Sequence, residues 1–106
     1  MEYSEKDWQI FKKRLPIWQD FYIKGLLNEY SVLINGEGDA AEKFWALKKA
    51  INKDVKSSGV FIRISRSTMM RSVLLLLRDK VIEIGDLDGF SDELINTIKS
   101  LSIFKI

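Results

Sequence analysis

Arginine is the residue type whose placement in this chain most clearly suggests chemistry. Arg63, Arg66, Arg71 and Arg78, four of the five arginines, lie close together in a sequence of 106 residues. The stretch 60–82 holds five basic residues and one acidic residue. A planar guanidinium group binds phosphate or carboxylate oxygens through paired hydrogen bonds. One interpretation of the cluster is therefore an anion-binding or nucleic-acid-binding face.

The alternative interpretation gives the same arginines a structural role. The next segment carries an excess of acids, and a short turn joins the two stretches. If the role is structural, at least one arginine should lie within about 4 Å of an acid in that segment. We prefer this interpretation. The expected partners are Asp86, Asp88, Asp92 and Glu93.

Other chemistries find little support. The chain has no histidine and no cysteine, so the commonest general base, the commonest metal ligand and the thiolate nucleophile are all missing. The pattern Gly36-x-Gly38-x-x-Ala41 matches a dinucleotide fingerprint but follows a predicted helix instead of a strand. Asp86-x-Asp88-Gly89 would place Ile84 and Ile95 at ligand positions of a calcium loop. We expect no catalytic residue, no cofactor and no metal.

Composition places the chain among soluble globular proteins. Hydrophobic residues make up 46%, charged residues 30%, and the net charge is +2. The longest apolar run, Val73–Leu77, is far shorter than the roughly 20 residues that span a bilayer. The charged N-terminus does not look like a signal peptide. We therefore expect a cytoplasmic protein that does not contact membranes.

Helical spacing of apolar residues dominates the pattern. It predicts a mainly α, compact, single-domain bundle of about five helices over residues 1–106. Pro16 should break or kink the N-terminal helical stretch. The apolar band of the next helix is so broad that neighbours should cover most of its circumference. The predicted helices are 4–15, 15–34, 39–55, 65–80 and 91–101.

Two segments leave alternatives open. Residues 60–64 alternate like a strand and could pair with 81–84 in a minor two-stranded β ribbon, with Arg63 facing Glu83. An extended crossover packed on the core fits 60–64 equally well. At the C-terminus we expect four apolar residues to be buried, either within the chain or in a homodimer contact. They are Leu101, Ile103, Phe104 and Ile106.

Several motifs resemble those of a group of short uncharacterised bacterial proteins with no assigned function. They are Trp8…Lys12-Lys13-Arg14-Leu15-Pro16-x-Trp18, Lys43-Phe44-Trp45, Arg66-Ser67-x-Met69 and Asp86-Leu87-x-x-Phe90-Ser91-Asp92-Glu93-Leu94. The resemblance spans nearly the whole chain and implies a bacterial source but no catalytic residues.

These observations favour a small non-enzymatic protein-interaction or regulatory module. Its partner would be another protein or a second copy of the chain. The alternative is a nucleic-acid-binding protein that uses the Arg63–Arg78 segment. Residues 65–82 resemble the recognition helix of winged-helix regulators, although the preceding predicted helix ends near Val55, too far away for a helix-turn-helix.

Overall fold

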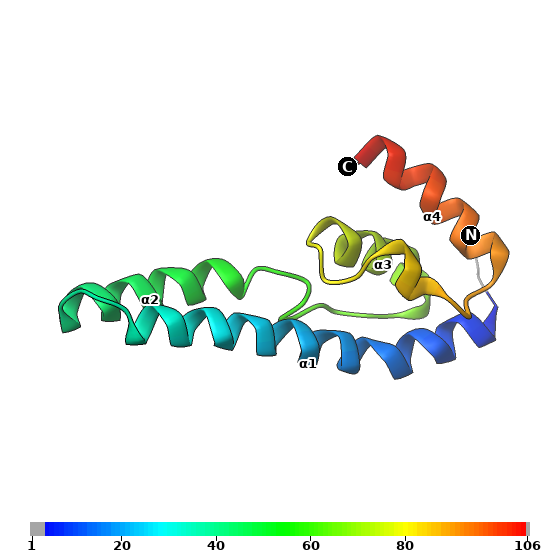
Figure 1. Ribbon diagram of the computed structural model, residues 1–106. Helices are drawn as coiled ribbons and strands as arrows, with labels where there is room; N and C mark the ends of the chain where they lie inside the picture. The colour runs from blue at the N-terminus through cyan, green and yellow to red at the C-terminus, as the bar shows by residue number, and fades with distance from the viewer. Residues whose placement is uncertain (1–3, 106) are drawn as a thin grey trace.

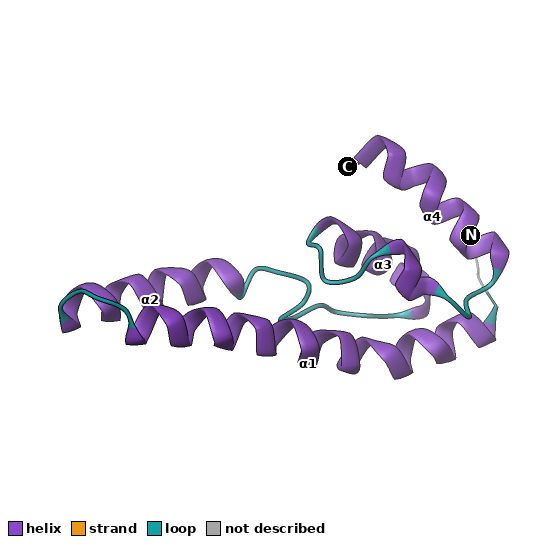
Figure 2. Cartoon of the chain, in the orientation of Figure 1, coloured by secondary structure: helices purple, strands orange, loops and turns teal. Residues whose placement is uncertain are grey.

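The chain folds into α-helices joined by turns and one extended segment. The computed structural model describes the backbone of residues 4–105 and the side chains of residues 4–101. Within that part there is no β-strand, which confirms the all-α class. Four α-helices are present, not five (Figures 1 and 2). The elements are α1 (Glu5–Asn35), α2 (Ala40–Asp54), the 3-10 helix η1 (Arg66–Thr68), α3 (Met69–Arg78), the 3-10 helix η2 (Ile84–Leu87) and α4 (Asp92–Lys105).

The molecule is elongated, so the predicted compact bundle is wrong. Its principal extents are 53 × 27 × 21 Å. The long helix α1 runs the length of the structure, and α2 folds back along its C-terminal half (Figure 1). The helices α3 and α4 lie over the N-terminal half. We call residues 22–55 the hairpin, and residues 5–18 together with 60–101 the lobe.

Pro16 does not end the first helix. It lies inside α1, which continues for another 19 residues to Asn35. A proline in a helix removes one backbone hydrogen bond, so the packing on either side must compensate. Phe11 and Trp18 flank Pro16 and meet edge to face, with ring centroids 6.4 Å apart. Both pack in the lobe, and this shared contact holds the two parts of α1 in one line.

The hydrophobic core lies entirely in the lobe. α3 carries most of it, because its apolar residues recur on one strongly amphipathic face. These residues meet the first turns of α1, the η2 segment and the inner face of α4. The core consists of Trp8, Phe11, Leu15, Met69, Val73, Leu76, Leu77, Ile82, Leu87, Phe90, Leu94 and Ile98.

The hairpin turn follows the local signals in the sequence. The Asp39 side chain accepts a hydrogen bond from the Glu42 backbone N–H at 2.8 Å, which confirms Asp39 as the N-cap of α2. Gly38 takes a φ of 128°, a conformation that favours glycine. At the other end of α2, the chain turns back through Ser57–Gly59 onto α1. There Gly59 lies directly against the ring of Tyr22.

No ribbon forms between 60–64 and 81–84. Residues 61–65 are extended but unpaired, so the crossover alternative is the one observed. Residues 81–83 form a turn that leads into η2. An isolated two-stranded β ribbon is only marginally stable in water. Here Val81 and Ile82 instead pack on the core of the lobe.

The C-terminal helix differs from expectation at its end. α4 continues to Lys105, and its buried residues are Leu94 and Ile98. Leu101 is 37% exposed, so its expected burial within the chain is wrong. The side chains of Ile103 and Phe104, and all of Ile106, lie outside the described residues.

Candidate functional site

Two of the four clustered arginines are held by acids. Arg66 forms two hydrogen bonds with Glu5, from Nε to Oε1 and from Nη2 to Oε2, both 3.1 Å. Its guanidinium group also lies 5.8 Å from the ring centroid of Trp8. The hydrogen bond from Arg66 lowers the pKa of Glu5, and the same pairing raises the pKa of Arg66. Arg66 thus joins the start of η1 to the first turn of α1.

Arg78 belongs to a second structural contact. Its Nε donates to Asp79 Oδ1 at 3.0 Å. The other carboxylate oxygen of Asp79 accepts from the backbone N–H and the hydroxyl of Ser58, at 3.0 and 2.7 Å. Burial raises the pKa of Asp79, but the hydrogen bonds from Arg78 and Ser58 together outweigh it and leave the pKa lowered. Asp79 therefore fixes the loop after α2 to the end of α3.

The acids expected to pair with the arginines have other roles. Among the described residues, neither ion-paired arginine contacts an acid between 86 and 93. The partner acids are Glu5, which lies 61 residues before Arg66, and Asp79, which directly follows Arg78, so that prediction is wrong. Asp86 instead accepts a hydrogen bond from the Glu83 backbone N–H at 2.8 Å. Arg14, which the sequence places in an ordinary basic cluster, donates to the backbone carbonyls of Asp86 and Asp88.

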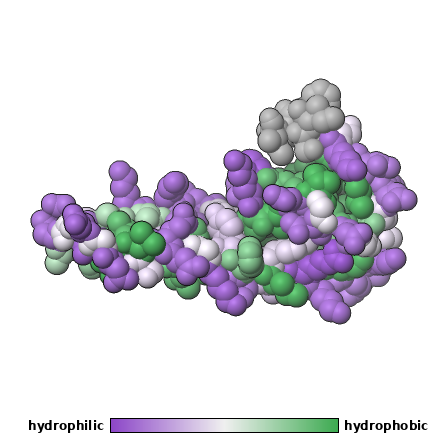
Figure 3. Space-filling model, in the orientation of Figure 1, coloured by the Kyte–Doolittle hydropathy of each residue, from purple (hydrophilic) through white to green (hydrophobic). Residues whose placement is uncertain are grey.

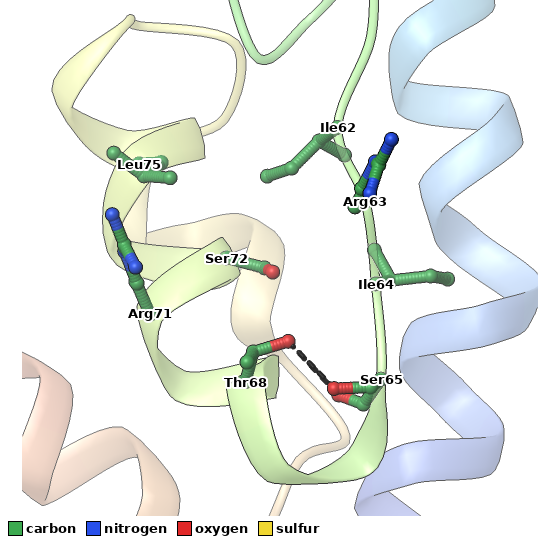
Figure 4. A pocket seen from close by; sticks show the side chains of 8 residues that line it. All are labelled: Ile62, Arg63, Ile64, Ser65, Thr68, Arg71, Ser72 and Leu75. Carbon is green, nitrogen blue, oxygen red and sulfur yellow. Dashed lines mark hydrogen bonds between the residues drawn. The ribbon is translucent and has the colours of Figure 1, made fainter.

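Arg63 and Arg71 differ from the other two arginines. Both are exposed, and neither forms an ion pair with any described residue. They come from opposite walls of an open pocket between the extended segment 61–65 and α3, and Figure 4 shows both guanidinium groups at the outer edges of these walls, not between them. The pocket has a volume of about 490 Å³, within the usual range for small-molecule sites. Its lining residues are Ile62, Arg63, Ile64, Ser65, Thr68, Arg71, Ser72 and Leu75.

The pocket combines apolar side chains with hydroxyl groups, and none of the described residues that line it carries a carboxylate. At one end, the hydroxyls of Ser65 and Thr68 are 2.9 Å apart and hydrogen-bonded. Ser72 is only 2% exposed, and Figure 4 shows its hydroxyl directed from α3 toward the extended segment. Ser72 Oγ forms no hydrogen bond with any described residue, and it is open to the pocket, because no fully buried side-chain oxygen or nitrogen of the described residues lacks a partner. We call this the arginine pocket.

A second candidate surface lies on the hairpin, where large apolar side chains face outward. Not one residue of α2 is buried. Figure 3 shows hydrophobic residues at the surface of the hairpin as well as on the lobe. The exposed large apolar side chains of the hairpin are Leu27 (57%), Val32 (75%), Ile34 (49%), Phe44 (62%), Trp45 (60%), Ile51 (39%) and Val55 (50%), and Ile17 (64%) and Phe21 (78%) precede it on α1.

Helical spacing shows on which side of α1 or α2 each of these residues lies. Leu27 and Ile34 are seven residues apart on α1, and Phe44, Ile51 and Val55 follow one another at intervals of seven and four residues on α2, so each set lies on one side of its helix. At about 100° per residue, each set lies about a quarter turn from the side of its helix that contacts the other helix. In an antiparallel pair both sets then fall on the same side of the hairpin. We call these five residues the hairpin face.

The sequence carried a signal for the hairpin face. The broad apolar band of α1 predicts neighbours around most of the helix, but α2 alone accompanies this half of α1. Phe44 and Trp45 are adjacent, so both cannot face α1 at once. Among the three tryptophans, Trp8 is buried, Trp18 is half-buried and Trp45 is exposed. The pattern therefore indicated more apolar surface than one chain can cover.

No helix in the described part of the chain combines the length and apolar composition needed to span a bilayer. The chain matches no protein-family model, no curated protein and no solved structure.

Proposed function

We propose that this protein is an interaction module that self-associates through the hairpin face, so that two hairpins form a four-helix arrangement. The observation that carries the proposal is the absence of any buried residue in α2. A helix in a protein gains most of its stability by burying an apolar face. Here that face is present in the sequence but uncovered, and a second hairpin would cover it.

The amount of apolar surface fits a dimer. An interface of standard size buries about 800 Å² on each partner. Homodimer interfaces are about 65% apolar, so about 500 Å² of apolar surface per copy is needed. The five residues of the hairpin face are between 39% and 62% exposed. A fully exposed aromatic residue presents about 150–250 Å², so Phe44 alone supplies about 90–155 Å², and the four aliphatic residues supply the rest of the face.

The shape of the molecule favours a second copy in antiparallel orientation. The lobe lies at one end of α1 and the hairpin at the other (Figure 1). Two hairpins that pair antiparallel about a two-fold axis keep their lobes at opposite ends of the assembly. Such an interface is self-complementary, because each copy contributes the same residues. The apolar faces of both copies are then buried at the same time.

The test compares two exposed phenylalanines, one in the hairpin face and one on α1 directly before the hairpin. Phe44 belongs to the hairpin face, whereas Phe21 lies on α1 about 120° away from Leu27. Sedimentation equilibrium should give a dimer mass for the wild type and for Phe21→Glu, and a monomer mass for Phe44→Glu. Ile51→Glu should behave like Phe44→Glu. Circular dichroism should show that every variant keeps its helical content.

Two results would contradict the proposal. A wild-type chain that stays monomeric across the accessible concentration range would rule out self-association through this face. Equal dissociation by Phe21→Glu and Phe44→Glu would place the contact elsewhere.

Nucleic-acid binding is the second candidate function. The observation in its favour is that Arg63 and Arg71 of the arginine pocket form no ion pair with any described residue. Binding of random duplex DNA, weakening steeply with salt, would support it.

A further inference from the structure

The segment 61–65 is extended like a β-strand but has no neighbouring strand. Residues 62–64 form no hydrogen bond with any described residue, through backbone or side chain. The sequence there, Phe61-Ile62-Arg63-Ile64, is rich in the β-branched and aromatic residues that strands favour. The N–H and C=O groups of three consecutive residues are therefore open on a segment suited to strand pairing.

The segment is held in this conformation from both ends. At its start the Phe61 N–H donates to Ser57 O at 3.2 Å, and at its end the Thr68 N–H donates to Ser65 O at 3.2 Å. Between these ends, Ile62 packs against the core of the lobe. A segment that is already ordered loses little conformational entropy when another chain pairs with it.

The segment is accessible to another chain. Phe61 is 67% exposed and Ile64 is 37% exposed, and Arg63 and Ser65 are exposed as well. Natural proteins usually pair, cover or charge such an edge, because its open backbone groups attract other chains. Here Arg63 supplies the only charge, and no strand of the described chain pairs with the segment. These features are those of a docking edge.

The charge of Arg63 determines which partner fits this edge. Its guanidinium group lies at the outer edge of the segment in Figure 4 and forms no ion pair with any described residue. In a strand pair, residues directly opposite each other share one face, and like charges there are destabilising. A second copy paired symmetrically about Arg63 would place two arginines opposite each other. A segment with a carboxylate at that position would instead form an ion pair.

The other face of the segment determines the neighbouring residue of the partner. Successive side chains of a strand point to opposite faces. Ile62 points toward α3, over the arginine pocket of about 490 Å³ (Figure 4). The partner residue opposite Ile62 would extend over the same pocket, toward Leu75. An apolar side chain there would leave water at a gain in free energy, whereas a charged one would lose its hydration at a cost.

We propose that the segment 61–65 docks an extended peptide segment of another protein by β-strand pairing. The backbone of the peptide forms hydrogen bonds with residues 62–64. An acidic side chain of the peptide pairs with Arg63, and an apolar side chain next to it lies over the arginine pocket. The segment shares no residue with the hairpin face, so this site is additional to the proposed self-association.

The experiment titrates the full-length protein with acetyl-Ser-Thr-Val-Glu-Val-Thr-Ser-amide and with the same peptide carrying lysine in place of glutamate. NMR chemical shifts should show that the glutamate peptide binds at least tenfold more tightly. The N–H groups of a strand point alternately to its two edges. Binding should therefore slow hydrogen exchange at least tenfold either at Ile62 and Ile64 or at Arg63 and Ser65, but not at both pairs.

A charge exchange separates strand pairing from general attraction. Arg63→Glu should bind the glutamate peptide at least tenfold more weakly than wild type does, and it should prefer the lysine peptide. Arg71→Glu changes the net charge by the same amount but lies on α3. It should weaken the glutamate peptide less than threefold and should not prefer the lysine peptide. The amide spectrum of each free variant shows whether the lobe remains folded.

N-methylated peptides test the backbone contribution. Methyl groups on the valine nitrogens block one edge of the glutamate peptide, and methyl groups on the threonine and glutamate nitrogens block the other edge. Strand pairing uses the N–H groups of one edge only. One of these two peptides should therefore lose binding at least tenfold, and the other should bind within threefold of the parent peptide.

Several outcomes would overturn the proposal. They include no binding of the glutamate peptide, equal losses from the two N-methylated peptides, and equal effects of Arg63→Glu and Arg71→Glu. Amide protection at 62–65 that rises with protein concentration alone would assign the segment to a second copy. Binding of duplex DNA that depends on Arg63, without peptide binding, would assign it to nucleic acid. Repeating the titration with Phe44→Glu separates these outcomes from the failure of self-association through the hairpin face.

Discussion

Asp7 and Ser91 join the two ends of the chain through a buried carboxylate. Asp7 Oδ1 accepts from the Ser91 backbone N–H at 2.8 Å, and Oδ2 accepts from the Ser91 hydroxyl at 2.7 Å. Asp7 is completely buried. The Ser91 hydroxyl in turn accepts from the Leu94 backbone N–H at 3.2 Å, which makes Ser91 the N-cap of α4. One carboxylate in the first turn of α1 therefore sets where α4 begins.

We expect Asp7→Ala to lower the free energy of unfolding by about 2 kcal/mol, because hydrogen bonds to a charged group contribute about 1.5–3 kcal/mol. Urea denaturation followed by circular dichroism measures the change. Glu5→Ala, two residues earlier on the exposed side of the same turn, is the control and should have a clearly smaller effect. Equal effects would show that the contact with Ser91 contributes nothing beyond helix-end electrostatics.

We expect Gly59→Ala to destabilise the protein by about 1–3 kcal/mol through overpacking. A Cβ atom at Gly59 would lie 2.3 Å from Tyr22 Cδ2, so the ring or the loop must move. Gly85→Ala is the matched control, because a Cβ there has no neighbour within 4 Å. Thermal melts of the two variants test the prediction. A Gly59→Ala variant as stable as wild type would mean that this loop does not pack on α1 as described.

We expect Asp79 to make part of the stability depend on acid pH. Its folded-state pKa is lowered from the ordinary value of 3.8, so the charged form is favoured by folding. That contribution is present above pH 3.8 and is lost as the pH falls through the lower, folded-state pKa. Urea unfolding of wild type and Asp79→Asn from pH 7 downward should show a gap that narrows below pH 4. A gap of constant size would contradict the proposed linkage.

We expect Tyr30 to ionise only in strong alkali. Burial raises its pKa, and the hydrogen bond to Asp54 Oδ2 at 2.5 Å raises it further, to about 12. The resulting stability is present below pH 10 and is lost as the pH rises through about 12. The ultraviolet absorbance of phenolate should show a late titration that Tyr30→Phe removes. A variant that retains the late titration would mean that another tyrosine is responsible.

The helix ends show how much of this fold could be predicted from local sequence. Asp39 and Ser91 cap the helices that were predicted to begin at 39 and 91, and Gly38 lies in the hairpin turn. These contacts join residues three apart, so a short stretch of sequence contains both partners. The inward residues of α3 were predictable for the same reason, because one amphipathic face shows in ten residues.

Arg78 pairs with the adjacent Asp79, but the partners of Arg66 and Arg14 could not be predicted in this way. Arg66 binds Glu5, which lies 61 residues earlier. Arg14 binds the carbonyls of a segment more than 70 residues later. Local charge balance suggested the acids of the following segment as partners, but those acids lie in and after η2 and at the start of α4. The path of the chain decides such contacts, and charge counts do not describe that path.

The sequence by itself determined the helical class, the helix starts and the apolar residues of the lobe, because these depend on interactions between residues close together in the chain. Only the tertiary structure decided that α1 continues through Pro16, because packing of Phe11 and Trp18 outweighs one missing hydrogen bond. It also decided that residues 61–65 stay unpaired beside α3, since Val81 and Ile82 pack on the core instead of forming a strand. That arrangement leaves Arg63 and Arg71 on opposite walls of one pocket.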